Sequence, residues 1–183
     1  MNTPTEQQLL ALLDRQKALW QSEKKCLPQL PFDEQWRSPC EVGEEQNGYI
    51  SWAAVKRDTN TDLHNIEEAL GIELHPTISV FFCSVYAGEL PCTFDGHPIQ
   101  LIQVWNEEDF RLLQENMIAH FMMQKRLKKP ASMFIASCSD EMQIISILNE
   151  TGQVQLETLG KGQEAVLAEN LADFLAQLTP VIE

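Results

Sequence analysis

The chain has 183 residues, of which 44% are hydrophobic and 22% charged, so we expect one folded domain spanning residues 1–183. Its 13 lysines and arginines against 27 aspartates and glutamates give a net charge of −14. A protein this acidic repels phosphate backbones and anionic lipid headgroups, which argues against nucleic acid binding and against direct membrane binding or insertion. The total charge predicts a basic partner.

Targeting signals and cysteine usage both indicate the cytoplasm. The sequence has no apolar run of the roughly 18 residues that a membrane span needs and no signal-peptide pattern at its start. Its five cysteines lie far apart and form no Cys-x-x-Cys pair, which is typical of reduced thiols. We therefore expect no disulfide framework, no metal site and no cofactor.

The N-terminal segment predicts a helix followed by an ordered loop. The helix begins behind the capping residue Thr3 and ends near residues 24–25. Residues 26–40 contain three prolines at irregular spacing, and their aromatic residues are unusual for a flexible linker. We expect this segment to lie across the surface of the domain.

A hairpin and a short helix follow. Residues 41–42 and 49–55 flank Gln46-Asn47-Gly48, and Asn-Gly readily adopts the positive φ values of a tight turn. A helix from about residue 62 to residue 70 precedes Gly71, which is placed to end it in a left-handed conformation. Strands are then predicted at 77–85, 90–94 and 99–105, the last two joined by the turn sequence 95–98.

The longest predicted helix begins behind Asn106 and ends in the basic tract 125–129. Acids occupy its first turn and bases its last, as the helix dipole favours. Its helical spacing predicts a buried stripe of Phe110, Leu113, Met117, Phe121 and Met122.

The C-terminal third predicts strands at 132–137, 143–148 and 154–158 and a last helix from about residue 164 to residue 178. The strands are consecutive and joined by short turns, which favours antiparallel pairing. We predict an α+β domain with a mainly antiparallel sheet of about six strands and helices packed against it.

A search for catalytic motifs finds no nucleophile elbow, zinc-protease helix or dinucleotide-binding loop. Gly160-Lys161-Gly162 lacks the rest of a phosphate-binding loop and is interpreted as a turn before the last helix. The four histidines lie too far apart for helical metal-ligand spacing, and Cys83 lies in an apolar strand where a thiol acts as a small hydrophobe. We therefore expect that the protein is not an enzyme.

Two charge clusters have both structural and functional interpretations. The acids at 107–109 suit a helix N-terminus, but they could also form an acid/base or metal site, or bind a basic ligand beside the ring of Trp105. The bases at 125–129 suit a helix C-terminus, and we prefer this interpretation to a phosphate or lipid patch. Residues 61–124 hold ten acids and one base, Arg111, so they predict a strongly negative surface.

Several segments together resemble the Syd family, the SecY-interacting proteins of gammaproteobacteria. They are HPTISVFFCSVYAGEL, LIQVWNEEDFRLLQENMIAHFMMQKRLKKP, MFIAS, ETLG and ENLADFLAQL, with Trp20, Ser38-Pro39-Cys40 and Trp52 extending the match toward the N-terminus. The resemblance implies an α+β fold related to the SUKH superfamily. It also implies attachment to the cytoplasmic side of the inner membrane through SecY, the channel subunit of the Sec translocase, and a proofreading or negative regulatory role.

The implied binding surface is a concave acidic face that recognises basic cytosolic loops of SecY. We hypothesise that its contacts come from Tyr86, Glu89, Asp95, Trp105, Glu107, Glu108, Asp109 and Glu115. Two alternatives stay open: an immunity-type inhibitor that captures a toxin, as in other SUKH proteins, and an enzyme that uses a carboxylate of raised pKa in a pocket.

Overall fold

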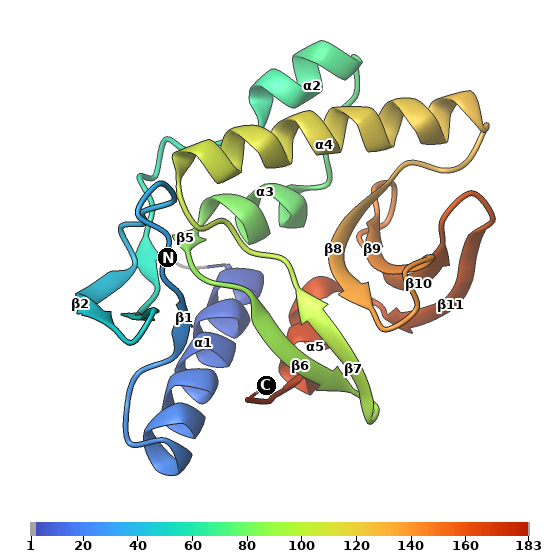
Figure 1. The fold of residues 1–183 in the computed structure, drawn as a ribbon. Helices are drawn as coiled ribbons and strands as arrows, with labels where there is room; N and C mark the ends of the chain where they lie inside the picture. Colours follow the sequence, from blue (N-terminus) through green and yellow to red (C-terminus); the bar gives the residue numbers. More distant parts are fainter. Residues whose placement is uncertain (1–2, 183) are drawn as a thin grey trace.

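The computed structural model describes residues 3–182, which form five helices and three antiparallel sheets (Figure 1). The helices are α1 (Pro4–Glu23), α2 (His64–Leu70), α3 (Pro76–Cys83), α4 (Glu107–Arg126) and α5 (Leu171–Gln177). The strands are β1 (Gln29–Pro31), β2 (Glu41–Gln46), β3 (Tyr49–Trp52), β4 (Val55–Lys56), β5 (Val85–Tyr86), β6 (Leu90–Phe94), β7 (His97–Leu101), β8 (Ser132–Cys138), β9 (Gln143–Leu148), β10 (Val154–Thr158), β11 (Gly162–Ala168) and β12 (Thr179–Pro180).

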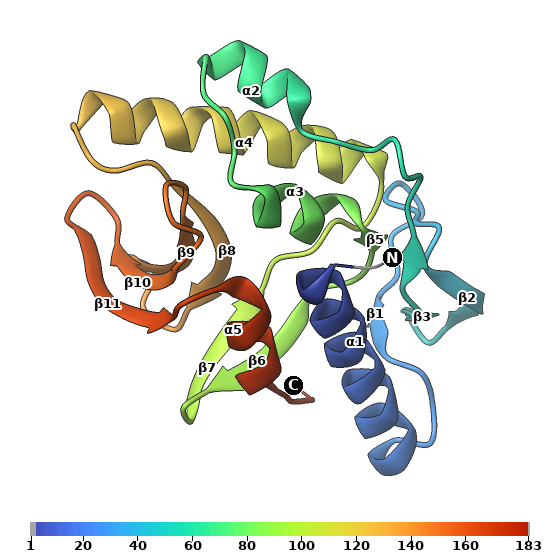
Figure 2. The same cartoon turned by 180° about the vertical axis from the view of Figure 1, so that it is seen from behind.

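The main sheet has seven strands in the order β11-β10-β9-β8-β7-β6-β12, and every pair in it is antiparallel. A smaller sheet, β1-β3-β2, lies at one end of the molecule, and β4 pairs with β5. The predicted α+β class with a mainly antiparallel sheet is confirmed. The strands β8 to β11 curl together on one side, while α1, α5 and β6 lie close to one another on the other side (Figure 2).

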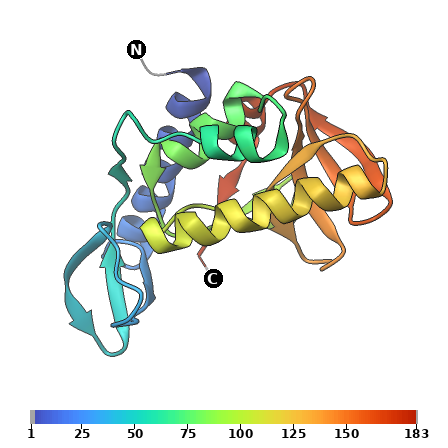
Figure 3. The ribbon, with the colours of Figure 1, turned by 90° about the horizontal axis from the view of Figure 1, so that it is seen from above.

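Helix α4 runs along the molecule from the small sheet to the curled strands β8 to β11 (Figure 3). It packs on β8 and α2, and α1 packs on α3 and α5. The predicted stripe on α4 is confirmed at Phe110, Leu113, Met117 and Phe121, which are buried, but Met122 is 60% exposed. Met122 lies one position beyond the buried row, where the helix turns its side chain toward solvent. No helix within residues 3–182 is long and apolar enough to cross a bilayer.

Local capping and turn signals predicted several boundaries correctly. Thr3 Oγ1 accepts a hydrogen bond from the Glu6 amide (3.2 Å) where α1 begins, and Gly71 ends α2 with a φ of 63°. Asn47 and Gly48 both have positive φ in the turn between β2 and β3. These features depend only on neighbouring residues, which is why the sequence reveals them.

The predicted strand at 77–85 is wrong, because most of it forms helix α3. Pro76 occupies the first turn of that helix, and the His75 side chain accepts a hydrogen bond from the Thr77 amide at its start. Ile78, Phe81, Phe82 and Cys83 are all buried. A short, continuous apolar run such as this one carries no periodicity that separates a helix from a strand.

The predicted helix at 164–178 is also wrong in its first half. Residues 162–168 form β11, which pairs with β10, and α5 begins only after Asn170, whose side chain accepts a hydrogen bond from the Asp173 amide (2.9 Å). The Gly160-Lys161-Gly162 turn therefore joins two strands instead of leading into a helix. Similarly, the strand predicted at 99–105 ends at Leu101, and residues 102–105 leave the sheet toward the start of α4.

Candidate functional site

The first turn of α4 is fixed by reciprocal hydrogen bonds. Asn106 Oδ1 accepts from the Asp109 amide (2.8 Å), and Asp109 Oδ2 accepts from the Trp105 amide (2.8 Å). Asn106 Nδ2 donates to the Arg37 carbonyl (2.9 Å), which joins this turn to the loop that precedes β2. The sequence pattern that predicted a helix start thus also fixes where the Asp109 carboxylate points.

Glu107 is held by a buried arginine. Arg57 lies between two aromatic rings, with its guanidinium carbon 4.5 Å from the Tyr86 ring centroid and 3.9 Å from that of Phe110. Its Nη2 lies 3.0 Å from Glu107 Oε1, and the Tyr86 hydroxyl donates to the same oxygen. The Arg57 side chain is 1% exposed whereas that of Glu107 is 72% exposed. Burial, and then the hydrogen bond to Glu107, raises the pKa of Tyr86.

The next acids on α4 are paired along its exposed face. Arg111 forms ion pairs with Glu108, three residues before it, and with Glu115, four residues after it. The pairing lowers the pKa of Glu108 through the hydrogen bond from Arg111. Much of the negative charge that the sequence placed on α4 is therefore balanced by the protein itself.

An acidic cleft of about 310 Å³ lies beside this helix start, and we call it the α4 cleft. It lies between the small sheet, the segment 87–89 and residues 102–109. Its carboxylates and tryptophan rings are Asp33, Trp36, Glu41, Glu89, Trp105 and Asp109. Gly88 is required at the cleft wall, because a Cβ there would lie 2.8 Å from Leu30 Cδ1 and 2.9 Å from Trp52 Cε2.

The carboxylates of the α4 cleft differ in how they are balanced. Glu41 pairs with Arg37 at 2.6 Å, whereas Glu89 accepts from the neutral Gln100 Nε2 (2.8 Å) and Asp33 from the Gln35 amide (2.9 Å). Within residues 3–182, no lysine or arginine forms an ion pair with Asp33, Glu89 or Asp109.

Asp109 is a carboxylate of the α4 cleft whose pKa is shifted by its surroundings. Burial raises its pKa, and the charge of Glu89 raises it further, while the Trp105 amide acts in the opposite direction. Burial therefore disfavours the ionised form of Asp109, and a cation that entered the cleft would stabilise that form. The enzyme alternative predicted a pocket carboxylate with a raised pKa, and Asp109 meets that single criterion.

The aromatic and amide groups complete the cleft. Trp105 Nε1 donates to the Trp36 carbonyl (3.0 Å), and the Trp105 ring packs edge-to-face on Trp52 with centroids 6.2 Å apart. Gln103 is 6% exposed, and its Oε1 has no hydrogen-bond donor in the part of the chain that the structure describes. The cleft wall thus offers carboxylates and tryptophan rings, which together suit a basic side chain.

The structure brings only some of the predicted contact residues together. Glu89, Trp105 and Asp109 line the cleft, while Tyr86 and Glu107 are bonded to each other beside it. Asp95 lies in the turn between β6 and β7, where its φ is 48°, and this hairpin extends away from α4 (Figure 1). The sequence did not predict Asp33, Trp36, Glu41 or Gln103 as cleft residues; the only available signal was the unusual aromatic content of the loop 26–40.

Two thiols, Cys83 and Cys92, lie outside the α4 cleft. Burial raises the pKa of Cys83 and of Cys92 to about 12, so both stay protonated thiols at neutral pH. In residues 3–182, no three histidine, cysteine or acidic side chains are arranged to hold a metal ion.

Comparisons with known proteins decide the family. The model of the family described as "Syd protein (SUKH-2)" matches residues 6–180. The chain belongs to the Syd family. It is 66% identical over 182 residues to "Protein Syd" of Psychromonas ingrahamii, covering 100% of this chain and 99% of that relative. It is 38% identical over 182 residues to "Protein Syd" of Aliivibrio fischeri, with 100% and 99% covered, and 37% identical over 174 residues to that of Aeromonas hydrophila, with 93% and 96% covered. The predicted Syd resemblance is confirmed, and the α4 cleft is therefore a feature of a Syd-family domain.

Proposed function

We propose that this Syd-family chain binds basic cytosolic loops of SecY and acts as a proofreading or negative regulatory factor of the translocase. In this proposal the chain is a peripheral protein of the cytoplasm and of the cytoplasmic side of the inner membrane, held there by SecY. The resemblance described above supplies the partner, and the α4 cleft supplies the chemistry. Cytosolic loops of membrane proteins carry an excess of lysine and arginine, which an acidic cleft attracts.

The observation that carries the proposal is the pair Glu89 and Asp109, two carboxylates that line one cleft and that no lysine or arginine of residues 3–182 pairs with. A lysine or arginine side chain entering between them would stabilise the ionised form of Asp109. The ring of Trp105 can contact its charge. Glu107, by contrast, already has Arg57 as its partner, so it contributes less to attraction at long range.

The test compares two double variants with the same change in net charge. Glu89→Gln with Asp109→Asn removes the unpaired charges of the cleft, while Glu108→Gln with Glu115→Gln removes two acids already paired with Arg111. Binding to SecY-containing membranes is measured at low and at physiological ionic strength. We expect the cleft variant to bind about tenfold more weakly or worse, because a close charge pair is worth about 1.5 kcal/mol or more. The control variant should remain near the wild type.

Equal losses in the two variants would mean that total charge matters and the cleft does not. A wild-type chain that fails to bind SecY even at low salt would exclude the proposal. Tight capture of a soluble basic toxin by that same chain would then favour the immunity-type alternative.

A further inference from the structure

The C-terminal end of α4 differs from the rest of the molecule in charge. No acidic residue occurs between Glu115 and Asp140, and this stretch contains Lys125, Arg126, Lys128 and Lys129. The β10–β11 turn adds a fifth base, because Lys129 Nζ donates to the Lys161 carbonyl (2.6 Å). None of the five forms an ion pair within residues 3–182. We call these five bases the basic end.

Helix-dipole complementation accounts for only part of this arrangement. Lys125 and Arg126 lie in the last turn of α4, but Lys128 and Lys129 lie beyond it and Lys161 comes from another element. The dipole also gives no reason for exposed apolar side chains among the bases. Met122, Met123 and Leu127 are all exposed large hydrophobic residues.

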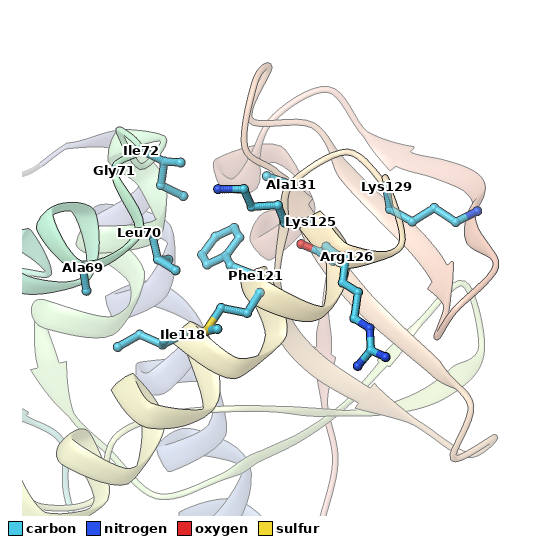
Figure 4. A pocket seen from close by; sticks show the side chains of 12 residues that line it. Ala69, Leu70, Gly71, Ile72, Ile118, Phe121, Lys125, Arg126, Lys129 and Ala131 are labelled. Carbon is cyan, nitrogen blue, oxygen red and sulfur yellow. The ribbon is translucent and has the colours of Figure 1, made fainter.

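An apolar pocket of about 650 Å³ opens beside the basic end, between α4 and the turn after α2. Figure 4 shows Leu70, Ile72, Ile118 and Phe121 around it, with Lys125 reaching across toward Ile72 while Arg126 and Lys129 point to the other side. Cations thus flank an apolar surface on two sides. Bases interspersed with exposed apolar side chains are characteristic of elements that lie in the interface of an anionic bilayer.

The acidic remainder of the chain does not cancel this local charge. Helix α4 has 20 residues, so its two ends lie roughly 30 Å apart. The screening length at physiological ionic strength is only about 8 Å, so the negative charges of the α4 cleft exert little force on a surface that touches the basic end. The net charge of −14 therefore argues against non-specific adsorption, but it does not exclude an oriented contact.

We infer that the basic end docks on the headgroups of anionic phospholipids in a bilayer, with Met122 and Leu127 entering the headgroup layer and the phosphates contacting the bases. The contact is adsorption at the surface and involves no membrane span. It does not depend on SecY. This contact would orient the molecule so that the N-terminal end of α4, and with it the α4 cleft, faces away from the bilayer.

The experiment measures co-sedimentation of the full chain with vesicles of phosphatidylcholine alone or of phosphatidylcholine mixed with phosphatidylglycerol, without SecY. We expect binding only to the mixed vesicles, falling as salt is raised. Arg126→Gln with Lys128→Gln should weaken partitioning about 30-fold, because each base near an anionic leaflet is worth about 1 kcal/mol, a factor of about five. Lys24→Gln with Lys25→Gln, the same charge change at the exposed end of α1, should have no such effect.

A second pair of variants tests the apolar contribution. Met122→Gln should lower binding to the mixed vesicles, whereas Met142→Gln, the same change at a similarly exposed methionine (54%) in the β8–β9 turn, should not. The inference is overturned if the two kinds of vesicle bind alike, if neither binds, or if either control variant loses as much as its counterpart. Displacement of the protein from the mixed vesicles by soluble poly-glutamate at equal charge concentration would also overturn it, because an acidic polypeptide would then be the preferred occupant.

Discussion

The two ends of α4 are each anchored by a buried charged group, but the two charges are balanced in different ways. At the N-terminal end, Arg57 lies between Tyr86 and Phe110 and is paired with Glu107, which is open to solvent. At the C-terminal end, Glu157 is 5% exposed and forms no ion pair within residues 3–182.

Neutral donors stabilise Glu157 instead. Its carboxylate accepts from Ser132 Oγ (2.6 Å), Ser146 Oγ (2.8 Å), Gln155 Nε2 (3.4 Å) and Gln124 Nε2 (3.4 Å). Gln124 belongs to α4, and its side chain also bonds to the backbone of Ser132, so this network ties the helix to the curled strands. An ion pair that reaches solvent is inexpensive to break, whereas a fully enclosed acceptor leaves several donors unsatisfied when it is removed.

The largest expected effect is therefore at the C-terminal end. Glu157→Leu should lower the free energy of unfolding by about 3 kcal/mol or more, because the hydroxyl and amide donors lose their shared acceptor in a buried site. Urea denaturation measures the change. Glu157→Gln keeps one acceptor oxygen and should cost less. A loss below about 1 kcal/mol for Glu157→Leu would mean that the donors find other partners and that the network does not anchor α4.

At the N-terminal end of α4, replacing Arg57 should cost more stability than replacing its ion-pair partner Glu107. Arg57→Ala removes packing between two rings and leaves the Phe82 carbonyl without the guanidinium donor that lies 3.2 Å away, so we expect a loss of about 2 to 3 kcal/mol. Glu107→Gln should cost about 0.5 kcal/mol or less, because the Glu107 side chain is solvated. The same denaturation measurement checks both values. Comparable losses would show that the ion pair, and not the packing of Arg57, stabilises this end.

The helix between these anchors was predictable from sequence, but the anchors were not. The cap at Asn106, the acids after it and the buried stripe are local patterns that define α4. Arg57 lies 50 residues from Glu107, and Ser132 lies 25 residues from Glu157, so their contacts arise only once the chain has folded. The α4 cleft shows the same division: Trp105 and Asp109 adjoin a recognisable helix start, whereas Asp33 and Trp36 reach the cleft through the path of an irregular loop.

A smaller expected effect is a pH dependence of the free energy of unfolding that arises at the C-terminal end of α4. His120, on α4 beside Glu157, is buried, and burial lowers its pKa below the ordinary value of 6.5 even though the charge of Glu157 acts in the opposite direction. Below pH 6.5 the unfolded chain binds a proton at this residue more readily than the folded chain does. Its contribution to stability is therefore complete above pH 6.5 and is lost as the pH falls, by no more than about 1.4 kcal/mol per pH unit.

The difference between the wild type and His120→Gln isolates this contribution, measured as the free energy of unfolding between pH 7.5 and pH 5.5. The variant should lose less stability on acidification than the wild type. Exposed His64 provides a control of opposite sign, because its hydrogen bond to Glu67 raises its pKa, so its contribution is present at low pH and is lost as the pH rises. If His120→Gln lost stability in parallel with the wild type, the pKa of His120 would be the same in the folded and unfolded chains, and burial beside Glu157 would not be holding its imidazole neutral.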